Sequence, residues 1–96
     1  MLESRIEKIF RTKVKKHGGK ALKFVSPGWA GAPDRLVLLP GGKMLFAELK
    51  APGHVFKPLQ SKRAEELREL GFTVYKIDSV EAINDFIREV FGKWVD

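Results

Sequence analysis

The sequence contains no cysteine, which excludes disulfide bonds and every metal site built on thiolate ligands. It also lacks a long apolar run, and charged residues recur throughout its first part, so we expect neither a membrane span nor a signal peptide. A soluble protein of the cytoplasm is the resulting expectation. With 96 residues, 44% of them hydrophobic, the chain predicts one small domain spanning residues 1–96.

Acidic residues are scarce in the first quarter of the chain. Residues 1–26 hold eight Lys or Arg but only two acids, Glu3 and Glu7, and therefore account for the whole net charge of +6. A localised positive field attracts polyanions such as nucleic acid. A basic helix can equally be an ordinary solvated surface, so charge alone leaves both interpretations open.

Apolar periodicity and the placement of glycine and proline predict a mixed α/β order. The segment 35–50 has the form of an antiparallel hairpin, whereas the segment 44–77 has the form of a crossover between parallel strands. We therefore predict a small mixed β-sheet flanked by helices. The predicted elements are helix 2–17, strand 21–25, loop 26–33, strand 35–39, turn 40–43, strand 44–50, helix 58–70, strand 72–77 and a last helix from residue 80, whose apolar stripe Trp94 extends.

Two polar side chains fall where helical periodicity predicts apolar ones. Glu3 lies within the apolar arc of the first helix, which begins with Leu2, and Glu7 lies at its edge. Gln60 shares the inner face of its helix with Ala64, Leu67 and Leu70. Unpaired buried polar groups are costly, which favours a functional reason for these positions. In the last helix, the spacing of Asp78 and Glu81 predicts an N-cap at Asp78.

Asp34 and the segment Glu48-Leu49-Lys50 carry the strongest chemical signal. Glu48 and Lys50 share one face of a strand, and the hairpin brings Asp34 next to them. Two carboxylates, together with the backbone carbonyl of Leu49, suit Mg²⁺ or Mn²⁺. Lys50 would stabilise negative charge developing on a phosphodiester. The pattern predicts a metal-dependent nuclease.

Further residues could complete this site. Glu3 could reach it from the first helix as a metal ligand or proton acceptor, and Gln60 could hold Lys50 or a water in register. Each residue also has a plainer interpretation. Asp34 is a common turn residue after proline, and Glu48 with Lys50 could be a charge pair on a solvated face. Arg35 and Lys43 could each contact phosphate, but exposed cations at strand ends are usually only solvated, which is the expectation for both. Trp29 either stacks on an exposed base or anchors its loop to the core.

Three sequence segments together resemble the signature of the virus-type replication-repair nuclease (VRR-NUC) family, a branch of the PD-(D/E)XK nucleases. They are Gly31-Ala32-Pro33-Asp34-Arg35, the run from Phe46 to Gly53 and Gln60. The similarity extends from Glu3 to about Ser79. It implies a restriction-endonuclease-like core with the order α-β-β-β-α-β-α.

The same resemblance implies metal-dependent hydrolysis of DNA, with Asp34, Glu48 and Lys50 in the central catalytic roles. The family's helix glutamate matches Glu3 better than Glu7. Stand-alone members of this family further imply a homodimer, encoded by a phage or bacterium, that acts on branched DNA such as a four-way (Holliday) junction during repair.

Two rival functions remain open at this point. A non-catalytic nucleic-acid-binding module would use the basic N-terminal helix on phosphates, and would bind DNA in a salt-sensitive way without cutting it. A structural dimerisation protein would neither bind nor cut DNA.

Overall fold

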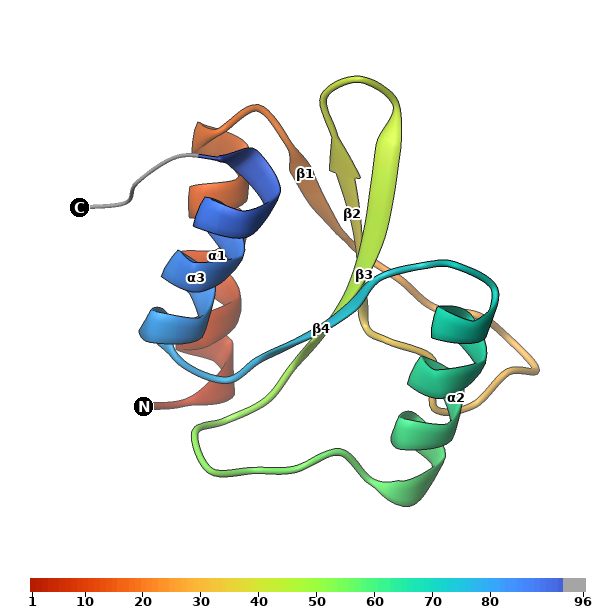
Figure 1. The fold of residues 1–96 in the computed structure, drawn as a ribbon. Helices are drawn as coiled ribbons and strands as arrows, with labels where there is room; N and C mark the ends of the chain where they lie inside the picture. The colour runs from red at the N-terminus through yellow and green to blue at the C-terminus, as the bar shows by residue number, and fades with distance from the viewer. Residues whose placement is uncertain (93–96) are drawn as a thin grey trace.

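The computed structural model describes residues 1–92 and has the predicted α/β order (Figure 1). The boundaries lie close to those expected from the sequence. In chain order the elements are α1 (Glu3–Lys16), β1 (Lys20–Lys23), β2 (Arg35–Leu39), β3 (Lys43–Leu49), α2 (Pro58–Glu69), β4 (Val74–Ile77) and α3 (Val80–Phe91).

The strands form one mixed sheet in the order β1-β2-β3-β4. β2 pairs antiparallel with both β1 and β3, and β3 pairs parallel with β4 through the crossover helix α2. The β2–β3 turn uses Gly41 and Gly42 at φ values of 85° and 78°, a backbone region that residues other than glycine rarely adopt. Both predicted connections, hairpin and crossover, are confirmed.

The helices cover the two faces of the sheet unequally. α1 and α3 lie side by side on one face, and α2 lies alone on the other (Figure 1). We call these the α1–α3 face and the α2 face. The α2 face buries only four hydrophobic side chains, Phe46, Ala64, Leu67 and Val74. The α1–α3 face holds the main core, formed by Ile6, Phe10, Val14, Val37, Leu45, Ala47, Leu49, Ile77, Ile83, Phe86 and Ile87.

Alternation along β3 sets the direction of its polar residues. Leu45, Ala47 and Leu49 belong to the main core, whereas Phe46 belongs to the α2 cluster. Because successive side chains of a strand point to opposite faces, Glu48 falls on the α2 face with Phe46.

The helix termini differ from the expectations. Leu2 and Leu70, both predicted to be core-facing, are 74% and 75% exposed, because they are the residues that cap α1 and α2. Glu3 is also exposed, since the first buried side chain of α1 is Ile6 and the core does not reach the first turn.

The N-cap of α3 is Ser79 rather than Asp78. The Ser79 hydroxyl oxygen accepts a 3.0 Å hydrogen bond from the backbone N–H of Ala82, whereas Asp78 lies 3.6 Å from the Lys76 ammonium. The prediction for Asp78 was therefore wrong by one position. The prediction for Trp94 falls outside the described residues. None of the helices within residues 1–92 is long and apolar enough to cross a membrane.

Candidate active site

Two hydrogen bonds join Asp34 to the Glu48-Leu49 segment where the β2–β3 ladder ends. The last paired residues are Arg35 and Ala47, so Asp34 and Glu48 face each other just beyond them. The backbone N–H of Asp34 donates to Glu48 Oε1 at 3.1 Å, and the N–H of Leu49 donates to Asp34 Oδ1 at 3.2 Å. Side-chain carboxylates thus replace the next backbone bonds of the ladder, which fixes both acids beside each other.

Burial makes this pair of carboxylates hard to ionise together. Glu48 is only 5% exposed, and its burial, together with the negative charge of Asp34, raises its pKa from 4.5 to about 7. The pKa of Asp34 is also raised, mainly by burial, although the hydrogen bond from Leu49 and the charge of Arg35 oppose this. A bound cation would favour the ionised form of both acids.

Lys50 and Gln60 both contact the same oxygen of Glu48. The Lys50 ammonium lies 3.8 Å from Glu48 Oε2, and Gln60 Nε2 donates to that oxygen at 2.9 Å. Gln60 Oε1 in turn accepts a 2.8 Å bond from the backbone N–H of Lys57, which holds the amide in place at the start of α2. The structure therefore places Gln60 on Glu48, whereas the sequence suggested contact with Lys50 or a water.

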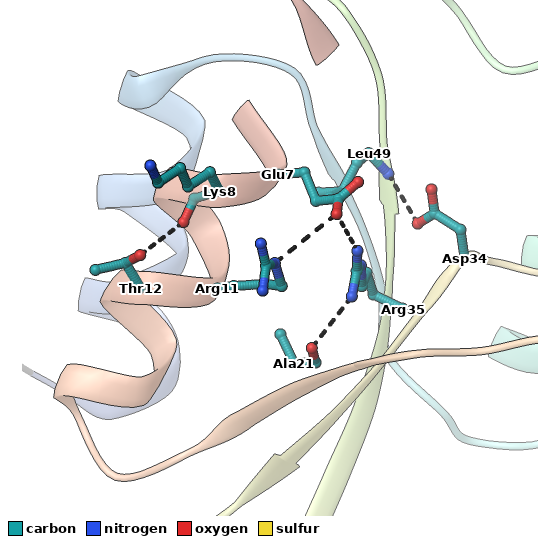
Figure 2. Close-up of polar contacts among 8 residues, drawn as sticks. All are labelled: Glu7, Lys8, Arg11, Thr12, Ala21, Asp34, Arg35 and Leu49. Carbon is teal, nitrogen blue, oxygen red and sulfur yellow. Dashed lines mark hydrogen bonds and ion pairs between the residues drawn. The ribbon is translucent and has the colours of Figure 1, made fainter. Parts of the chain in front are cut away.

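The two glutamates of α1 take different positions. The charge of Glu3 contributes to the raised pKa of both Asp34 and Glu48, but its side chain is exposed. Glu7 instead forms ion pairs with Arg35 and, at 3.8 Å, with Arg11 (Figure 2). The charge of Glu3 therefore acts on both acids, whereas Glu7 is held by Arg35 and its charge raises the pKa of Asp34 alone.

Arg35 was wrongly expected to be solvated. It is 7% exposed, pairs with Glu7 and donates to the backbone carbonyl of Ala21 at 3.3 Å. A signal for this was present in the sequence. Arg35 shares a face of its strand with Val37, and an arginine on an inward face requires an acidic partner.

The loop before Asp34 is fastened to α2 by Arg63, a residue that sequence reasoning missed. Arg63 Nε donates to the carbonyl of Ala30 at 2.8 Å, and its guanidinium lies 5.2 Å from the centre of the Trp29 ring. Trp29 packs against the α2 cluster, which makes it an anchor of the loop. Gly31 is required where this loop meets α2, because a Cβ there would lie 2.7 Å from Leu59 Cγ.

Similarity to known proteins agrees with this geometry, although no family model matches the sequence. The fold is similar to a solved structure described as a VRR_NUC domain, with a TM-score of 0.82 and 32% identity over 91% of this chain and 94% of that one. The sequence is 51% identical over 77 residues to the protein named "Putative nuclease p44" of Acyrthosiphon pisum secondary endosymbiont phage 1, covering 80% of this chain and 83% of the relative. The chain belongs to the VRR-NUC family.

The donor set of this VRR-NUC chain fits a hard cation such as Mg²⁺. Asp34 and Glu48 offer two adjacent carboxylates, and within residues 1–92 no group of three or more acidic, histidine or cysteine side chains could hold a metal. The Leu49 carbonyl points to the same side of β3 as its N–H, which bonds Asp34, and so adds a third oxygen. Mg²⁺ characteristically combines one or two carboxylates with several waters, and the buried Glu48 with the half-buried Asp34 provides that number of carboxylates.

Proposed function

We propose that this VRR-NUC protein is a divalent-metal-dependent endonuclease that hydrolyses phosphodiester bonds of DNA. The observation that carries the proposal is that two hydrogen bonds hold the carboxylates of Asp34 and Glu48 side by side, next to Lys50, in a chain of this family. Carboxylates whose pKa is raised by burial lower the stability of the folded protein, so their presence favours a catalytic role for the pair.

Asp34, Glu48 and the Leu49 carbonyl would hold Mg²⁺ or Mn²⁺. When bound, such an ion polarises a phosphoryl oxygen and lowers the pKa of a coordinated water. Lys50 stabilises negative charge on the phosphate oxygens through its ammonium, 3.8 Å from Glu48. Gln60 orients the Glu48 carboxylate through its 2.9 Å hydrogen bond. Glu3, at the exposed start of α1, would accept a proton or bind the metal through a water from the solvent side.

We further propose that the protein acts as a homodimer on branched DNA, such as a four-way junction, in the bacterial or phage-infected cytoplasm. Leu38 and Met44 are 39% and 37% exposed. The strand register puts them on the α2 face towards the β2–β3 turn. Covering them with a second copy would bury apolar surface, and two-fold symmetry would present two active sites to paired strands. Sedimentation tests this directly: we expect a dimer for the natural protein and a monomer for Leu38→Lys, and a monomeric natural protein removes this part of the proposal.

The catalytic proposal is tested with purified protein and labelled duplex, flap and four-way-junction DNA, in EDTA, Mg²⁺ or Mn²⁺. We expect cleavage only with metal, and a loss of about 10³-fold or more for Asp34→Asn, Glu48→Gln and Lys50→Ala. The exposed α2 residues Glu65 and Lys62 offer the matched controls Glu65→Gln and Lys62→Ala, which should cut normally.

Full cleavage by all three site variants would refute the assignment. Salt-sensitive binding without any cleavage by the natural protein would instead favour the non-catalytic binding module.

A further inference from the structure

The solvent side of α1 carries a continuous set of cations next to β1. Two hollows flank this surface. One, of about 310 Å³, is lined by Arg5, Lys8, Ile9, Thr12 and Lys13. The other, of about 300 Å³, lies between α1 and β1 and is lined by Arg11, Lys15, Gly19, Lys20, Ala21 and Leu22. We call the second hollow the basic groove. Neither lining includes an acidic residue.

A tight reversal of the chain forms the basic groove. Gly19 is buried at the α1–β1 turn, where a Cβ would lie 2.9 Å from the Leu38 carbonyl oxygen and 3.0 Å from Val14 Cγ1. Only a residue without a side chain allows this close approach. As a result, Arg11 and Lys15 of α1 line the same hollow as Lys20 of β1.

Helix stability does not account for these cations. Lys15 lies in the last turn of α1, where positive charge is favourable, but Arg5 lies in the first turn, where the helix dipole opposes it. Within residues 1–92, no acidic side chain forms an ion pair with Lys8, Lys15 or Lys20. Lys8, Lys15 and Lys20 therefore keep their charge available for a partner outside the chain, whereas Arg11 shares its charge with Glu7.

The basic groove is connected to the catalytic end of the sheet. Arg11 pairs with Glu7, Glu7 pairs with Arg35, and Arg35 follows Asp34 in the sequence (Figure 2). Lys15 lies two further turns along α1 from Glu7, a distance of about 12 Å. Phosphates of one strand recur every ~3.4 Å along the axis of B-DNA, so such a length matches several phosphates on one side of the scissile bond.

We propose that the basic groove binds backbone phosphates of the DNA substrate and sets the direction in which the strand leaves the active site. This inference rests on the proposed function for the identity of the ligand. Arg11, Lys15 and Lys20 would supply positive charge to these phosphates, a kind of contact that positions the strand and carries no sequence information.

The test compares two double variants of the full chain that lose the same charge. The groove variant carries both Lys15→Gln and Lys20→Gln. The control variant carries Lys43→Gln, next to the β2–β3 turn, and Lys62→Gln, on α2. All four lysines are exposed, and melting curves verify that both variants fold. Binding of labelled duplex DNA is measured by fluorescence anisotropy in EDTA over a series of salt concentrations. We expect the groove variant to bind about tenfold more weakly and the slope of log K against log salt to fall by about 2. The control variant should match the natural protein.

Equal affinity and slope in the groove variant and the control would overturn the inference. Because this binding assay uses no metal, it gives its answer whether or not the protein cuts DNA. A failure of the groove is thereby distinguished from a failure of the proposed nuclease activity.

Discussion

The two faces of the sheet serve different purposes. Within residues 1–92, the α1–α3 face buries eleven hydrophobic side chains, and several of them have no exposure at all. Aromatic rings such as those of Phe10 and Phe86 pack edge to face in this core. The α2 face buries four, and at its end it holds two carboxylates whose pKa values are raised by burial. The comparison indicates that one face supplies the stability that lets the other carry an unfavourable pair of acids.

The two faces should differ most in how much unfolding free energy is lost when a buried side chain is replaced by alanine. Phe10 is fully buried, so Phe10→Ala should cost about 4 kcal/mol of the free energy of unfolding, measured by urea denaturation. Leu67→Ala on the α2 face should cost about 2 kcal/mol, because Leu67 is 6% exposed and its neighbours can relax towards solvent. Leu70→Ala, on the same helix but 75% exposed, is the control and should cost close to nothing. An equal cost for Phe10→Ala and Leu67→Ala would break the comparison.

The acidic pair should make the metal-free protein less stable as the pH rises. The pKa of Glu48 is about 7 in the folded protein against 4.5 ordinarily, so the folded state holds a proton that the unfolded state releases between these values. The contribution of Glu48 to the free energy of unfolding should therefore be largest below pH 4.5. It should fall by up to about 3 kcal/mol as the pH rises past 7. Asp34 acts in the same direction.

Thermal melting in EDTA from pH 5 to pH 8 measures this effect. Glu48→Gln should remove most of the pH dependence, and Mg²⁺ at pH 8 should raise the melting temperature of the natural protein but not that of the variant. A melting temperature of the natural protein that rises over this pH range would contradict the assignment of Glu48.

Gln60 tests whether the α2 face orients the site. Its amide contacts Glu48 and the start of α2, so Gln60→Ala should lower cleavage or the apparent affinity for Mg²⁺ by about 10- to 100-fold while the fold persists. Ser61→Ala, an exposed neighbour, should leave both unchanged. If Gln60→Ala keeps the natural apparent affinity for Mg²⁺ and the natural cleavage rate, the hydrogen bond of Gln60 stabilises the fold but does not orient the site.

The smallest expected effect concerns the cap of α3 on the opposite face. Ser79→Ala should cost about 1 kcal/mol of unfolding free energy, because it removes the hydrogen bond to Ala82. Asp78→Ala should cost less than about 0.5 kcal/mol, since its pairing with Lys76 is partly exposed. Both variants should cleave normally. If Asp78→Ala lowers the unfolding free energy more than Ser79→Ala does, Asp78 is the N-cap, as the sequence pattern predicted.

Local patterns predicted the elements well and the ends of elements less well. Periodicity located all three helices and four strands of the described chain, because the alternation of apolar residues records which side of each element is covered. It misplaced Leu2, Leu70 and Glu3, because an ideal helical wheel extends beyond the point where the core ends. The placement of Gln60 next to the candidate site was anticipated, but its contact with Glu48 depended on how α2 crosses the sheet.

The sequence by itself determined the order of elements, the two turns of the mixed sheet and the spacing that puts Glu48 and Lys50 on one face, since these follow from local backbone geometry. Only the tertiary structure decided that Arg35 is buried against Glu7, that Arg63 fastens the loop before Asp34, and that Arg11 and Lys15 meet Lys20 in one groove. The contacts of Arg35 and Arg63 join residues far apart in the chain, and the geometry of all three arrangements is set by how whole helices pack on the sheet.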